Sequence, residues 1–151
     1  MRIAIANDHA GLELKKEIAE GLAKLGHRVE DFGTHDNSSV DYPDFATRVA
    51  KAVRDGQVDA GVLVCGTGIG MSIVANKYRG VRAALCTTEF EARMARQHND
   101  ANVLCMGERV VGPGLGRAIA EAFVGTQFEG GRHLKRVQKI ADAEREADGL
   151  K

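Results

Sequence analysis

The six-residue run Ala60–Cys65 is apolar at every position and leads directly into a glycine-rich loop. An unbroken apolar run of this length is typical of a strand buried on both faces of a parallel sheet. Four more short apolar runs, at 3–6, 29–32, 81–85 and 103–106, alternate with amphipathic stretches of helical period. Five successive strand–helix units predict an α/β fold: a three-layer α/β/α sandwich with a Rossmann-like, five-stranded parallel sheet.

The stretches between the predicted strands carry their apolar residues on one helical face. In residues 11–25 apolar side chains recur every three or four positions. The helix after the third strand is expected to end near Lys77. The helix after the fifth strand is expected to bury one face that carries Leu115, Ile119 and Phe123. An extra C-terminal helix follows. No linker or repeat interrupts the pattern, so residues 1–151 are expected to form a single domain.

Composition excludes several classes of function. The chain has 21 basic and 21 acidic residues, so we expect no nucleic-acid partner held by bulk charge. No segment reaches the roughly 20 apolar residues of a membrane span, and the first apolar run is too short for a signal peptide. The three cysteines form no CxxC motif, which predicts neither a disulfide framework nor a structural zinc site. We therefore expect a cytoplasmic protein without membrane contacts.

Polar residues collect where the predicted strands end. In open parallel sheets, ligands bind outside the carboxyl ends of the strands, where the winding direction reverses. The segments at these ends are 7–9, 33–41, 65–70, 86–88 and 107–109. The sequence therefore predicts that the functional site is built from these loops.

The loop Cys65–Gly70 has glycine at every second position, so its backbone can turn sharply and present several N–H groups to one point. With a helix starting behind it, such a loop is a candidate nest for a phosphate or a developing oxyanion. It lacks the Lys-Ser/Thr ending of a nucleotide-binding P-loop, and Met71 replaces the last glycine of the dinucleotide fingerprint. A tight turn without a ligand is the structural alternative.

Cys65 ends the strand just before this loop, where a thiolate would be a nucleophile or a general base. Cys86 and Cys105 have no such loop and are expected in the core. Asp8 and His9 end the first strand. If that strand lies beside the third, the pair faces Cys65.

Two further polar groups lie outside these loops. His98 ends a predicted helix, where a histidine is also common as a simple polar terminus. Arg132 and Arg136 are four residues apart, so both guanidinium groups share one helical face. Two such groups, with Arg109 as a third candidate, suit a phosphate dianion. A solvated surface face is the alternative interpretation.

Together these residues resemble the ribose-5-phosphate isomerase B family, which also contains allose- and galactose-6-phosphate isomerases. The matching segments, in family order and over nearly the whole chain, are 8–11, 41–43, 65–70, 75–77, 96–100, 107–112 and 129–133 with Arg136. The resemblance implies a sheet of strand order 2-1-3-5-4. It also implies interconversion of ribose 5-phosphate and ribulose 5-phosphate, in the non-oxidative branch of the pentose phosphate pathway.

The resemblance also implies catalytic roles. Cys65 is expected to move a proton between C1 and C2 through a cis-enediolate. Thr67 and His98 are the expected ring-opening pair, and Asp8 hydrogen-bonds the sugar. Family members without this cysteine use a glutamate at the position of Met71, so the chain groups with the cysteine users. The implied substrate-binding residues are His9, Tyr42, Gly66, Gly68, Ile69, Gly70, Asn99, Arg109, Arg132 and Arg136.

The expected partners are a phosphorylated sugar and a second copy of the chain. The resemblance implies a homodimer, possibly paired into tetramers, in which His98 reaches Cys65 of the partner subunit. It implies no metal and no organic cofactor. A six-carbon sugar phosphate is the alternative substrate, and a non-catalytic phosphosugar-binding module or a nucleotide-binding domain is an alternative from another class.

Overall fold

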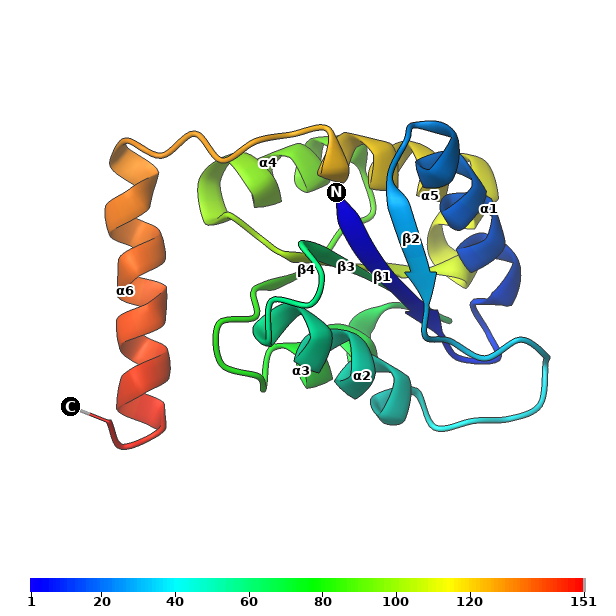
Figure 1. The fold of residues 1–151 in the computed structure, drawn as a ribbon, viewed down its shortest axis with the longest axis horizontal. Helices are drawn as coiled ribbons and strands as arrows, with labels where there is room; N and C mark the ends of the chain where they lie inside the picture. Colours follow the sequence, from blue (N-terminus) through cyan, green and yellow to red (C-terminus); the bar gives the residue numbers. More distant parts are fainter. Residues whose placement is uncertain (151) are drawn as a thin grey trace.

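The structure is a computed structural model and describes residues 1–150. Strands and helices alternate through the chain (Figure 1). In order they are β1 (Arg2–Asn7), α1 (Leu12–Lys24), β2 (Arg28–Asp31), α2 (Tyr42–Arg54), β3 (Ala60–Cys65), α3 (Ile69–Ala75), β4 (Ala83–Leu85), α4 (Glu89–Asn99), β5 (Val103–Gly107), α5 (Glu108–Val124) and α6 (Arg132–Ala147).

The five strands form one parallel sheet of order β2-β1-β3-β5-β4. This confirms the predicted fold class and strand order. Every residue of β3, the central strand, is buried, as its uninterrupted apolar sequence predicts. The carboxyl ends of β1, β3 and β5 come level, because Asn7 pairs with Val64 and Cys65 pairs with Gly107.

Two apolar clusters lie between the sheet and its helical layers. One packs α1, α4 and α5 on one face, around Ile5, Leu104 and Phe123. The other packs α2 and α3 on the opposite face, around Val49 and Leu63. Helix α6 belongs to neither layer and stands to one side, meeting the body near the end of α4 (Figure 1). No helix among residues 1–150 is both long enough and apolar enough to cross a membrane.

Two predicted boundaries near β4 shift for a common reason. Helix α3 ends at Ala75 rather than near Lys77, because the Asn76 side chain leaves the helix. Its amide donates to the Ala83 carbonyl at 2.9 Å and accepts the Ala83 N–H at 2.8 Å. The strand itself starts only at Ala83, since the Arg82 N–H donates to the Asn102 side chain at 2.8 Å. Side-chain hydrogen bonds here replace the helix and strand bonds that the apolar pattern predicts.

Helix α5 bends at Gly112, whose backbone (φ 68°, ψ 176°) is not helical, just before Pro113. In the segment after the bend Ile119 and Phe123 are buried, while Leu115, in its first turn, is 43% exposed. Including Leu115 in the buried face was therefore wrong. A glycine before a proline ends one helical segment and starts another.

Candidate active site

Cys65 lies at the carboxyl end of β3 with only 5% of its surface exposed. The loop after it turns back over the sulfur, and the Gly68 N–H donates to Cys65 Sγ at 3.0 Å. Gly68 reaches this position with φ of 79°, a left-handed conformation that favours glycine. The next N–H, of Ile69, donates to Thr67 Oγ1 at 3.3 Å. The loop therefore orients the sulfur with a backbone donor.

The end of β5 and the start of α5 pack closely against this loop. A side chain at Gly107, at the end of β5, would overlap the backbone of Thr67. The Arg109 N–H donates to the Gly66 carbonyl at 3.1 Å, and the Arg109 guanidinium passes beside Gly66. The glycine loop and the start of α5 therefore form one surface.

Tyr42, the first residue of α2, covers the other side of the loop. Its ring lies where a Cβ on Gly70 would stand, at 2.6 Å, so only glycine lets the ring sit so close. The predicted residues Tyr42, Gly66, Gly70 and Arg109 are thus brought to Cys65 within one chain.

Asp8 and His9 follow β1 at the same edge, as predicted from the adjacency of β1 and β3. The Asp8 N–H donates to the Val64 carbonyl at 3.2 Å, and its buried carboxylate accepts the Ala10 N–H at 2.9 Å. The Val40 N–H donates to His9 Nδ1 at 3.2 Å. A backbone N–H can only donate, so Nδ1 carries a lone pair and the neutral ring presents Nε2–H.

Sequence reasoning missed two residues that hold these loops in place. Lys15 is buried on α1, and its ammonium contacts the Thr34 carbonyl at 2.7 Å and the Asp31 carboxylate at 2.9 Å. A lysine next to Leu14 on the apolar face was the available signal. Glu108, at the start of α5, accepts the Leu14 N–H at 2.9 Å. Lys15 tethers the segment that leads to Tyr42, and Glu108 links the first turns of α1 and α5.

The other predicted residues lie at the opposite edge of the sheet. The end of α4 adjoins the amino end of β4, because Arg82 donates to the carbonyls of Asn99 and Asp100 at 3.1 and 2.8 Å. From the first to the last residue of β3, Ala60 to Cys65, five steps of about 3.3 Å put roughly 16 Å between the two edges. In one chain His98 and Asn99 therefore do not reach Cys65.

Arg132 and Arg136 stand on the first turns of α6, beside the end of α4. They belong with His98 rather than with His9 and Arg109. The expected convergence of all four cationic side chains is therefore not found within one chain, which instead carries two groups of candidate residues. A cavity of about 640 Å³ lies between α6 and β4, and among the predicted residues only Asn99 lines it.

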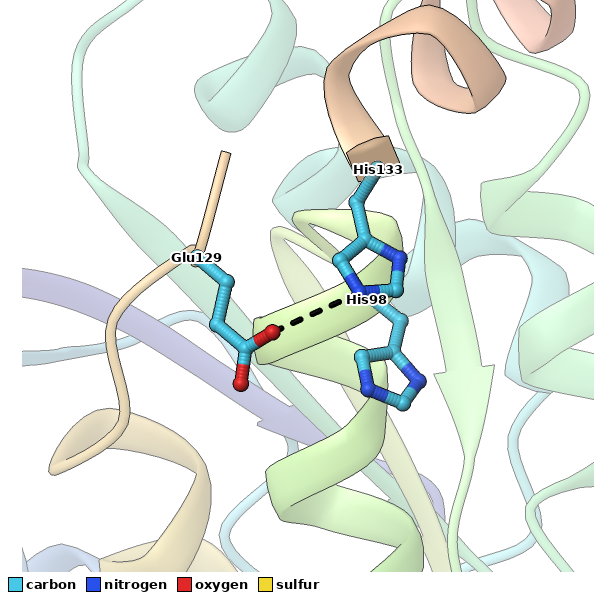
Figure 2. A group of neighbouring side chains, drawn as sticks. All are labelled: His98, Glu129 and His133. Atoms are coloured by element: carbon cyan, nitrogen blue, oxygen red, sulfur yellow. Dashed lines mark ion pairs between the residues drawn. The ribbon is translucent and has the colours of Figure 1, made fainter. Parts of the chain in front are cut away.

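His98 stacks on His133, with ring centroids 4.2 Å apart and an angle of 11° between the rings (Figure 2). Glu129 Oε2 lies 3.4 Å from His133 Nε2, and the Arg132 Nε–H donates to the same nitrogen at 3.3 Å. Burial, aided by His98 and Arg132, lowers the pKa of His133 below its ordinary value of 6.5. At neutral pH this ring is therefore neutral and accepts from Arg132.

His98, Glu129 and His133 are also a set that could hold a metal ion, with ligand atoms within 4.8 Å of one another. The ring planes argue against this use. The nitrogen lone pairs of an imidazole lie in its plane, so two nearly parallel, stacked rings cannot direct them to one ion. The neighbouring Arg132 guanidinium adds positive charge at the same place.

The other two cysteines are core residues, as predicted. Burial raises the pKa of Cys86 to about 12 and raises that of Cys105 further. All three cysteines are free.

The carboxyl edge of this parallel sheet carries a glycine loop, a thiol and cationic side chains. This combination is typical of α/β proteins that act on small anionic ligands. The sequence model of the Ribose/Galactose Isomerase family matches residues 3–140. The chain therefore belongs to that family.

Curated relatives agree in length as well as in sequence. A putative sugar phosphate isomerase of Bacillus subtilis is 52% identical, over 95% of this chain and 97% of the relative. Ribose-5-phosphate isomerase B of Escherichia coli is 49% identical, over 95% of this chain and 96% of the relative.

Solved structures are similar throughout. Ribose-5-phosphate isomerase B of Clostridium thermocellum is 54% identical, with a TM-score of 0.95 over 97% of this chain and 99% of the other. The Mycoplasma genitalium enzyme with bound ribulose 5-phosphate is 46% identical, with a TM-score of 0.91 over 96% of this chain and 97% of the other.

Proposed function

We propose that this chain is an aldose–ketose isomerase that interconverts ribose 5-phosphate and ribulose 5-phosphate. The observation that carries the proposal is the Gly68 N–H bond to the Cys65 sulfur, 3.0 Å long, at the edge of the sheet where His9 and Arg109 also lie. Relatives of nearly full length are named for this reaction.

Cys65 is the base in this proposal. The sulfur takes the proton from C2 of the open-chain aldose, a proton passes from the C2 hydroxyl to the C1 oxygen, and the proton on sulfur returns at C1. C2 is oxidised to the ketone while C1 is reduced to the alcohol, so no outside oxidant or cofactor is needed. The N–H groups of the glycine loop stabilise the enediolate oxygens between the two transfers.

The phosphate is held by cationic and N–H donors. His9 presents Nε2–H, since Nδ1 accepts from Val40, and Arg109 contributes a guanidinium beside Gly66. Arg132 and Arg136 complete the set from a second copy of the chain. Four donors of this kind suit a dianion.

A homodimer with a shared site follows from the division of these residues between two edges of the sheet. His98, the proposed partner of Thr67 in ring opening, meets Cys65 only if α4 of one chain approaches the glycine loop of another. Exposed apolar residues near that loop, Ile69 (51%), Ile73 (55%) and Leu85 (39%), support contact with a second chain. Light scattering in solution would show whether these dimers pair into tetramers.

The substrate is tested by comparing kcat/KM for ribose 5-phosphate, allose 6-phosphate and galactose 6-phosphate. We expect ribose 5-phosphate to be preferred by about tenfold or more, since one extra carbon in a close-fitting pocket costs that much. The family description also names galactose, so a six-carbon sugar phosphate is the second candidate. A higher value for either hexose phosphate would replace our choice.

The turnover assay and a melting curve together address the alternatives from other classes. A phosphosugar-binding module would bind ribose 5-phosphate without turning it over. A nucleotide-binding domain would gain thermal stability from NAD or ATP, which we expect to have no effect on Tm. We place the enzyme in the cytoplasm, in keeping with its three unpaired cysteines.

A further inference from the structure

His133 is buried to 97% of its surface, yet the reaction proposed above gives it no task. Its ring lies flat against His98, 4.2 Å between centroids. Figure 2 shows the two rings one above the other, with Glu129 beside His133. The stack joins two elements, since His98 lies in the last turn of α4 and His133 in the first turn of α6.

The stack of His133 on His98 restricts the plane of the His98 ring. His98 is half-buried and lies in the last turn of α4. The partner ring is itself fixed, because the Glu129 N–H donates to the Gln97 carbonyl at 3.1 Å and the His133 N–H donates to the Gly130 carbonyl at 2.9 Å. The first bond holds the segment before α6 against α4 and the second fixes the first turn of α6, so His133 has little freedom to move.

The charge state of His133 also suits a ring that packs against His98. Glu129, Arg132 and Arg136 surround His133, with His98 on its flat face. The pKa of His133 is lowered, so at neutral pH its ring is uncharged and does not repel a proton on His98. A neutral ring face also attracts an imidazolium stacked on it.

We propose that His133 is a positioning residue for the ring-opening step, acting through His98. This inference rests on the isomerase function proposed above. In that step His98 donates a proton to the ring oxygen of ribose 5-phosphate, the bond from C1 to that oxygen breaks, and the C1 hydroxyl releases its proton to water to leave the aldehyde. Water then returns a proton to His98. No electrons are exchanged with any other molecule.

The substrate pair offers a way to separate this step from the proton transfer at Cys65. Ribose 5-phosphate is a closed ring, whereas ribulose 5-phosphate has its C5 oxygen blocked by phosphate and stays open. Exchange of the C1 hydrogen of ribulose 5-phosphate in D2O therefore needs Cys65 but no ring opening. The exchange is measured by NMR on the dimeric enzyme, beside turnover of ribose 5-phosphate.

We compare His133→Leu, which removes the flat ring, with His133→Phe, which keeps a ring for stacking. His133→Leu is expected to lower kcat for ribose 5-phosphate by about tenfold or more, with the exchange rate at saturating ribulose 5-phosphate within about twofold of the parent. Both His133→Leu and His133→Phe lose the hydrogen bond from Arg132, so a rise in KM should be the same in the two variants. His133→Phe is expected to retain most of kcat. Gln138→Leu, at an exposed position of α6, is the control and should change neither reaction. His133→Asn is a second non-stacking variant should leucine disturb the docking of α6.

Unchanged turnover of ribose 5-phosphate in folded His133→Leu or His133→Asn would overturn the inference. Equal loss of turnover and exchange would also overturn it, because His133 would then support the whole site rather than ring opening. Failure of the proposed function has a different signature: the parent enzyme itself would show neither turnover nor exchange.

Discussion

The backbone around His9 decides which of its nitrogens can meet a ligand. The Val40 N–H donates to Nδ1, so Nε2 is the nitrogen that carries a proton in the neutral ring. A histidine held in this way acts as a directed hydrogen-bond donor even without a positive charge. The segment before α2, which Lys15 tethers, thus bears directly on the phosphate binding that we propose for His9.

This gives a prediction for two substitutions of His9. Gln places an N–H donor near the position of Nε2, whereas Asn keeps an acceptor near Nδ1 and has no donor there. We expect His9→Asn to raise KM for ribose 5-phosphate by about tenfold, with a smaller rise for His9→Gln. Steady-state kinetics at constant ionic strength measure both, and equal KM values would argue against binding through Nε2–H.

Cys65 supports a second prediction at the residue scale. Cys65→Ala should lower kcat by about a thousandfold, because general-base catalysis contributes on this order. The substitution removes one atom from a site of low exposure, so Tm and binding of the phosphosugar should change little. Calorimetric titration with ribose 5-phosphate and a melting curve provide the controls. Near-full turnover by this variant would remove Cys65 from its proposed role.

Contacts between elements shape the glycine loop. Gly107 ends β5 and has an ordinary φ of −112°, so its importance is steric. Any side chain there would meet the Thr67 backbone, which cannot move without displacing the loop from Cys65. Helix α5 and the loop after β3 therefore depend on each other.

We predict that Gly107→Ala lowers the free energy of unfolding by about 2 kcal/mol and also lowers activity, because overpacking against backbone costs 1–3 kcal/mol. Gly114→Ala, on the adjoining helix α5, is the control, since nothing lies within 4 Å of its added Cβ. It should stay within about 0.5 kcal/mol of the parent. Urea denaturation measures both variants, and similar values for the two would contradict the steric explanation.

Docking of α6 depends on the neutral form of His133. Its pKa in the folded chain lies below 6.5, so the unfolded chain binds the proton more readily. The stability that this residue contributes is therefore present above about pH 6.5 and is lost as the pH falls through the lower folded-state pKa. Protonation also exchanges the partner of Nε2, from Arg132 to Glu129.

Melting temperatures between about pH 8 and pH 5 test this dependence. Tm of the parent should fall more steeply below pH 6.5 than Tm of His133→Phe, which has no proton to gain at that position. Parallel curves for the two proteins would show that His133 does not contribute to the acid sensitivity.

At the scale of the whole molecule, the two groups of candidate residues belong to opposite edges of one sheet. Residues after a parallel strand and residues at the end of the following helix necessarily lie at opposite edges, because the helix runs back along the sheet. A site that needs both Cys65 and His98 therefore needs two chains.

Subunit complementation tests this arrangement. Cys65→Ala and His98→Ala are each expected to be nearly inactive, but a dimer of one chain of each kind contains one intact pair. After random mixing, about half of the dimers contain one chain of each kind, and each of these has one working site of two. Co-refolded protein should therefore recover about a quarter of the parent activity. No recovery in demonstrated mixed dimers would place each site within a single chain.

The sequence by itself determined the fold class, the strand order through family resemblance, and the loop with Cys65. These features follow from local patterns: apolar period, glycine spacing and the alternation of strands with helices. Family membership is also a property of the sequence, since it spans residues 3–140. The local patterns could not foresee the shortened β4, because the side chains of Asn76 and Asn102 make bonds that the apolar period does not encode.

The predicted sheet already placed Asp8 and Arg109 at the same edge as Cys65. Only the tertiary structure decided the contacts made there: it set the Tyr42 ring against Gly70 and joined the Val40 N–H to His9 Nδ1. These contacts link segments that are far apart in the chain, so no local pattern encodes them. The stack of His133 on His98 has the same origin, since it joins two helices that meet only when α6 docks on α4.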